Sequence, residues 1–154
     1  MANGPILQAR RVVPLLRSPN RKEGRHVSRE PSADLLREFT ATFNTRDLDA
    51  VMAYFTDDAV FVSPRGPDPW GTLFEGKDRV REGLAARFAG LPVLHYGDDQ
   101  HFVVGDRGAS EWILTGTTPE GDRLEVHGCD LWTFRDGLIS RKDSYWKIVV
   151  PSSS

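Results

Sequence analysis

Residues 123–149 read RLEVHGCDLWTFRDGLISRKDSYWKIV, and this stretch decides the fold class. Two segments rich in apolar residues flank Asp136-Gly137, a dipeptide typical of a tight β-hairpin turn. Alternate residues of the first segment are mostly apolar, as in a strand with one buried face: Leu124, Val126, Trp132 and Phe134. The pattern predicts a hairpin of two long antiparallel strands, over residues 123–134 and 138–149.

Asp130 stands in the middle of that apolar face. A buried carboxyl group either finds hydrogen-bond donors or stays protonated, because burial raises its pKa. A protonated acid of this kind serves as a general acid, or as a donor to a developing oxyanion. A structural carboxylate bonded to a backbone or tryptophan N–H fits the position equally well, so both interpretations stand.

The residue opposite Asp130 depends on the register of the hairpin. Counting outward from the Asp136-Gly137 turn, strict pairing places Asp143 opposite Asp130. A bulge of one residue places Lys142 or Ser144 there instead. The sequence leaves these three alternatives open.

The rest of the chain completes an α+β pattern. Helical spacing of apolar residues predicts helices over 32–44, 47–55 and 77–89, and a short strand over 59–63 separates the last two. Alternating segments at 93–104 and 109–117 add two strands to the hairpin. We therefore expect a single α+β domain with its helices on one face of a curved antiparallel sheet.

The charge of the chain is unevenly distributed. Residues 1–31 contain seven basic and two acidic residues, and the remainder has thirteen basic and twenty acidic residues. We expect a disordered, basic Pro/Arg-rich tail over 1–31, a folded domain over 32–150 and a flexible end over 151–154. The acidic domain argues against nucleic acid as a partner.

The sequence also bears on location and cofactors. The apolar stretch at 12–16 is too short for a secretion signal, and no apolar run is long enough to span a membrane. We therefore expect a cytoplasmic protein that does not bind membranes. With one cysteine, Cys129, and no ligand spacing typical of a metal site, we expect neither a metal nor another cofactor.

Several short motifs resemble those of one family. LREF (36–39), NTRDLDAV (44–51), FTDDAVF (55–61), FEGKD (74–78) and DLWTFRDGLI (130–139) together resemble the SnoaL-like proteins of the nuclear transport factor 2 superfamily. The resemblance covers about residues 33–149. It implies a cone in which three N-terminal helices pack on a strongly curved, mostly antiparallel sheet around an internal apolar pocket. It also implies a homodimer joined through the sheet.

The resemblance transfers function only in part, because the superfamily contains isomerases, cyclases, epoxide hydrolases and proteins that only bind. Asp130 falls where ketosteroid isomerases keep a protonated acid, but Ser63 replaces their general-base aspartate. Phe39 replaces a pocket tyrosine. Ser144 replaces the catalytic aspartate of cyclase-like relatives, with Asp143 one residue before it.

Two functional hypotheses follow. In the first, the chain is an isomerase-, cyclase- or dehydratase-type enzyme for a small, mostly apolar carbonyl compound. Asp130 is then the acid or oxyanion donor with Asp143 as its partner, and Lys142 or Ser144 holds the polar end of the ligand. In the second hypothesis, the chain is a non-catalytic pocket protein or a dimeric scaffold. Six residues are expected to line the pocket: Phe39, Phe55, Ser63, Leu84, Trp132 and Trp146.

Overall fold

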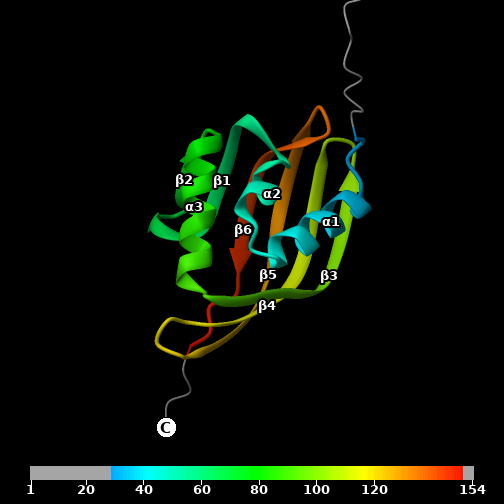
Figure 1. The fold of residues 1–154 in the computed structure, drawn as a ribbon. Coiled ribbons are helices and arrows are strands. Elements are labelled where there is room, and N and C mark those ends of the chain that lie inside the picture. Colours follow the sequence, from blue (N-terminus) through cyan, green and yellow to red (C-terminus); the bar gives the residue numbers. More distant parts are fainter. Residues whose placement is uncertain (1–28, 151–154) are drawn as a thin grey trace, which may run out of the picture.

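A computed structural model describes residues 29–150, and three helices lie on one face of its six-stranded sheet (Figure 1). The helices are α1 (Ala33–Asn44), α2 (Leu48–Met52) and α3 (Lys77–Gly90). The strand order is β2-β1-β6-β5-β4-β3, in which β1 and β6 are parallel and all other neighbours are antiparallel. The strands are β1 (Phe55–Asp68), β2 (Gly71–Glu75), β3 (Val93–Val104), β4 (Arg107–Thr117), β5 (Arg123–Arg135) and β6 (Leu138–Trp146).

Side-chain caps begin the first two helices. The Ser32 hydroxyl accepts a hydrogen bond from the Leu35 N–H at 3.1 Å, and the Asp47 carboxylate accepts one from the Ala50 N–H at 3.0 Å. The prediction for the second helix was wrong at its end. Helix α2 stops at Met52, because Phe55 already belongs to β1 and is fully buried there.

The first hairpin of the sheet differs most from the prediction. Strand β1 is much longer than residues 59–63, and β2 lies where no strand was expected. Gly71 starts β2 with φ of +97°, and a Cβ atom there would lie 1.9 Å from the Ser63 carbonyl oxygen. Position 71, where the chain reverses direction between β1 and β2, therefore requires glycine.

Strands β3 to β6 form the predicted meander, with one irregularity in β3. The register shifts by one residue between Gly97 and Gln100, where Asp98 has φ of +48°. Asn44 at the end of α1 holds this region: its amide donates to the Tyr96 carbonyl at 2.9 Å and accepts from the Tyr96 N–H at 2.8 Å. These bonds fix α1 against the edge of the curved sheet.

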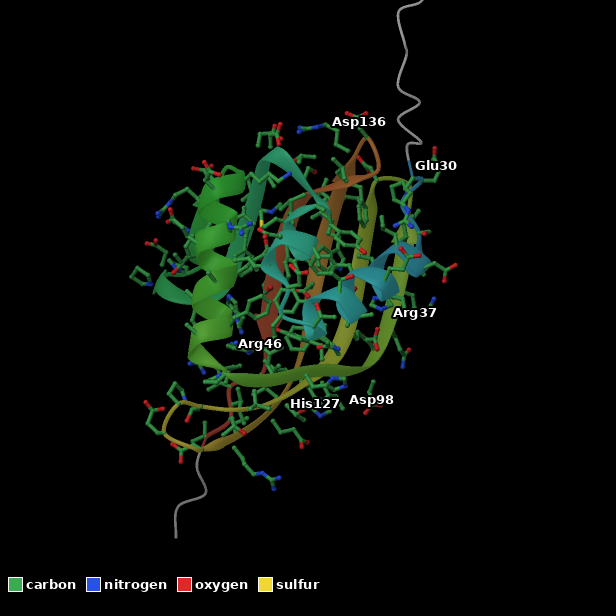
Figure 2. The ribbon with its side chains drawn as sticks, in the orientation of Figure 1. Glu30, Arg37, Arg46, Asp98, His127 and Asp136 are labelled. Atoms are coloured by element: carbon green, nitrogen blue, oxygen red, sulfur yellow. The ribbon has the colours of Figure 1, made fainter. Side chains whose placement is uncertain are left out.

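The ends of the described chain lie at the surface. Arg29 forms an ion pair with Glu38, and its backbone packs against Gly137 in the β5–β6 turn. Figure 2 shows Glu30 and Asp136 at the same end of the molecule. The described residues exclude most of the predicted tail over 1–31, with the segment considered as a secretion signal. They also exclude the predicted flexible end over 151–154. Within residues 29–150, no helix is long and apolar enough to cross a membrane.

Candidate functional site

A bulge in β6 decides what faces Asp130. Thr133 pairs with Arg141 whereas Phe134 pairs with Ile139, so Ser140 is the extra residue. The shift places Ser144 opposite Asp130, which is one of the three alternatives that the sequence left open.

The same bulge separates the two predicted catalytic carboxylates. Asp143 pairs with Leu131, whose side chain is exposed on the other face of the sheet. There the Asp143 carboxylate accepts a hydrogen bond from Arg141 at 3.0 Å. The structure therefore does not bring Asp143 next to Asp130.

Three donors converge on the buried Asp130 carboxylate. Lys142 Nζ and Ser144 Oγ each donate to Oδ1 at 2.5 Å, and Trp112 Nε1 donates to Oδ2 at 2.9 Å. Lys142 Nζ also donates to Ser144 Oγ at 2.7 Å. Asp130 is thus held as a hydrogen-bond acceptor. The Trp112 contact matches the second of the two interpretations that the sequence left open, a carboxylate bonded to a tryptophan N–H, rather than a protonated carboxyl group that donates.

Lys142 is a buried cation between two aromatic rings. Its Nζ lies 5.3 Å from the centroid of Phe61 and 5.2 Å from that of Trp132, within the range of cation–π attraction. Burial lowers the pKa of Lys142, while the neighbouring Asp130 carboxylate opposes that shift. The ammonium therefore loses its proton more readily than that of an exposed lysine.

A second series of hydrogen-bonded polar side chains, from β3 and β4, holds Trp132, the ring beside Lys142. Trp132 Nε1 donates to Ser110 Oγ at 2.8 Å, and this hydroxyl lies 2.8 Å from His101 Nδ1. His101 Nε2 in turn lies 2.6 Å from the Asp99 carboxylate. The sequence did not predict this series of hydrogen bonds, because the contacts depend on the register between strands. The available signal was Ser110, a polar residue at an inward position of an alternating strand.

Three spaces of very different volume lie beside or beyond the Asp130–Lys142 pair. A space of about 10 Å³ touches Asp130 and Lys142, which is room for about one water molecule. A cavity of about 310 Å³ lies further along the strands and is lined in part by Ser63, Phe74, Arg87 and Trp146. A hollow of about 630 Å³ is lined mainly by outward-pointing residues such as Glu111, His127 and Tyr145, so it lies on the other face of the sheet. Figure 2 shows His127 and Asp98, which also lines that hollow, at one end of the sheet.

The predicted pocket residues divide among these places. Phe39 and Trp132 line the small space, and Ser63 and Trp146 line the larger cavity. Phe55 and Leu84 are buried in the core and line neither space. In the described part of the chain, no group of three or more His, Cys, Asp or Glu residues could hold a metal ion.

Tyr96 lines the small space, and its raised pKa predicts that the folded protein becomes less stable at alkaline pH. Burial raises its pKa from 10.0 to about 12. Between these values the unfolded chain loses the phenolic proton more easily than the folded chain, so stability falls as pH rises from 10 to 12, by about 2–3 kcal/mol. Chemical unfolding across this range measures the slope.

Tyr96→Phe should flatten that slope, and Tyr145→Phe on the exposed outer face is the matched control. An unchanged slope in Tyr96→Phe would contradict the assignment.

Comparison with known proteins agrees with the fold. The model of the SnoaL-like domain family matches residues 36–142. Similar structures include a protein of unknown function from Burkholderia pseudomallei K96243 (21% identity, 74% of this chain and 88% of that chain covered, TM-score 0.66). Another is a proposed polyketide cyclase from Pseudomonas putida KT2440 (19% identity, 75% and 91% covered, TM-score 0.67).

A third similar structure is TerC co-crystallised with polyporic acid (22% identity, 74% and 89% covered, TM-score 0.65). No curated protein sequence matches the chain. The helices on an open, curved, mixed sheet confirm the predicted α+β cone, and the family match covers most of the folded part. The chain belongs to the SnoaL-like domain family.

Proposed function

We propose that this protein is an acid/base enzyme for a small, mostly apolar carbonyl compound, with Lys142 as the group that carries the proton. The observation that carries the proposal is the buried Lys142–Asp130 pair on the concave face of the sheet. Taking two charges out of water is costly, and strongly perturbed ionisable groups concentrate at functional sites. The proposed cyclase and TerC among similar structures fit a pocket enzyme of this family.

The hydrogen bonds suggest how the roles divide. In the proposed step the Lys142 ammonium donates a proton to the carbonyl oxygen, and the adjacent carbon releases a proton to water. Lys142 then regains a proton from the solvent, so the net change is ketone to enol. Asp130 keeps the ammonium in place, and Ser144 bridges the two groups. A lowered lysine pKa favours this transfer near neutral pH.

The larger cavity offers the route to the pair. Ser63 lies two residues beyond Phe61 on the same face of β1, and Phe61 pairs with Lys142 of β6. A ligand in this cavity would meet Lys142 after a side-chain movement of Phe61 or Trp146. Isomerisation, aldol-type cyclisation and dehydration next to a carbonyl group can each proceed through such an enol or enolate, so the proposal covers these three reaction types together.

A second candidate function is non-catalytic binding. It is favoured by the space of only about 10 Å³ at the pair, and by the complete hydrogen bonding of Asp130. In that case the pair is structural, and a ligand occupies only the larger cavity.

Hydrogen–deuterium exchange separates the two functions. We expect the wild type to accelerate exchange of the protons next to the carbonyl of cyclohexanone in D₂O, followed by NMR. Lys142→Met should reduce the accelerated rate about 100-fold or more, as for loss of an acid/base group. Lys147→Met, which removes an exposed lysine directly after the same strand, is the matched control.

Equal exchange by the wild type and Lys142→Met would contradict the enzyme proposal and favour the binding function. Circular dichroism verifies folding, and the double variant Lys142→Met/Asp130→Asn removes the pair without leaving a buried unpaired charge. The homodimer stays a prediction, which light scattering of the purified protein tests.

A further inference from the structure

The larger cavity has two guanidinium groups against one indole ring. Arg65 of β1 lies 5.0 Å from the centroid of Trp146, and Arg87 of α3 lies 4.4 Å from it. All three residues line the cavity of about 310 Å³. Segments distant in sequence thus place two positive charges beside a flat apolar wall.

Neither guanidinium has an acidic partner within residues 29–150. No carboxylate of this part of the chain lies within 4.0 Å of Arg65 or Arg87, whereas Arg79, Arg81 and Arg135 all form ion pairs. Both guanidinium groups can therefore pair with an anionic group of a ligand, because guanidinium forms charge-assisted hydrogen bonds with carboxylates.

The helix dipole accounts for only one of the two arginines. Arg87 lies in the last turn of α3, where a cation is favourable next to the helix C-terminus. Arg65 lies on a strand, so the helix dipole does not account for it. The charge of Arg87 also contributes to lowering the pKa of Lys142, which indicates that its field reaches the buried pair.

We propose that this cavity binds a small planar carboxylate, with its carboxylate group held by Arg65 and Arg87 beside Trp146. Guanidinium groups suit carboxylates because they donate paired hydrogen bonds in a plane. The apolar body of the ligand would contact the remaining apolar lining: Phe74, Leu91 and Leu124.

The proposal deepens the function proposed above, because it names a carboxylate-bearing compound as the substrate class. The carboxylate proposal rests on the proposed function in one respect: that the substrate enters through this cavity. Ser63 on the inner rim lies between the arginines and the Lys142 pair along the strands, so a carbonyl at the far end of the ligand would point toward Lys142.

Binding of two matched probes tests the charge requirement. Isothermal titration calorimetry would compare trans-cinnamate with the neutral trans-cinnamamide at low salt. The wild type should bind the carboxylate roughly tenfold more tightly than the amide, since one charged hydrogen bond contributes at least that much. Arg65→Gln and Arg87→Gln should each abolish most of this preference, and Arg107→Gln, an exposed arginine outside the cavity, should keep it.

Equal binding of the two probes by the wild type would overturn the proposal, and so would a preference that survives in the double variant Arg65→Gln/Arg87→Gln. A ratio of affinities does not depend on the fraction of folded protein. Lys142→Met separates this proposal from the proposed function: it should lose proton exchange and keep the carboxylate preference. A preference without any exchange in the wild type would sustain the carboxylate site and contradict the enzyme.

Discussion

A Lys142→Met variant is expected to lose about 3–5 kcal/mol of unfolding free energy, the usual cost of removing one member of a buried ion pair. Methionine fills a similar volume and keeps the contact with Phe61 and Trp132, so the loss comes from the charge rather than from a cavity. The Asp130 carboxylate would remain in an apolar surrounding without its cation, and Ser144 and Trp112 alone would bond it. Urea unfolding, followed by far-UV circular dichroism, measures the change.

The double variant Lys142→Met/Asp130→Asn should recover most of that loss. An amide in place of the carboxylate keeps an acceptor for Trp112 and removes the unpaired charge, and replacing both members of a buried pair is often close to neutral. Lys147→Met, which removes an exposed lysine without an ion pair in residues 29–150, is the control and should change stability by less than about 0.5 kcal/mol. If the single and double variants were equally unstable, the cost would come from packing and the electrostatic explanation would fail.

Local patterns in the sequence predicted most of the fold. The stripe of Leu35, Leu36, Phe39 and Phe43 on α1 is buried as its spacing indicates, because helical periodicity and capping act over a few residues. The meander was predicted for the same reason, since each hairpin is a local structure. The parallel pairing of β1 with β6 was missed, because it joins segments about 80 residues apart and no local pattern reports such a pairing. Strand β2 forms a local hairpin with β1, but the prolines and glycines within residues 64–71 conceal it from an alternation of apolar residues.

The site was predicted only as far as the inward position of Asp130. One bulged residue, Ser140, decides whether Asp143 or Ser144 faces Asp130, and nothing in the alternation distinguishes a bulged strand from a regular one. The size of the space beside the pair was also beyond the sequence. It depends on how the rings of Phe43, Tyr96 and Trp112 pack together, which is a property of the whole core.

Gly128→Ala is the second substitution with a large expected effect, because Gly128 makes room for the side chain that holds Asp130. A Cβ atom at this position would lie 2.3 Å from Cη2 of Trp112 and 2.5 Å from the Tyr145 carbonyl oxygen. Both the indole ring and the neighbouring strand would have to move. Overpacking of this kind costs about 1–3 kcal/mol, and loss of the Trp112–Asp130 hydrogen bond adds about 1–3 kcal/mol.

We therefore expect Gly128→Ala to lose about 3 kcal/mol or more in urea unfolding, together with the near-ultraviolet circular dichroism signal of Trp112. Gly90→Ala is the matched control: a Cβ there meets nothing within 4 Å, so alanine should leave stability unchanged or raise it slightly. Trp112→Phe removes the ring atoms that would clash with the new methyl group. The double variant should then lose less than the sum of the two single losses, because the substitutions share one contact. Additive losses would mean that the Tyr145 carbonyl oxygen alone sets the cost, and that Gly128 matters to the strand rather than to the site.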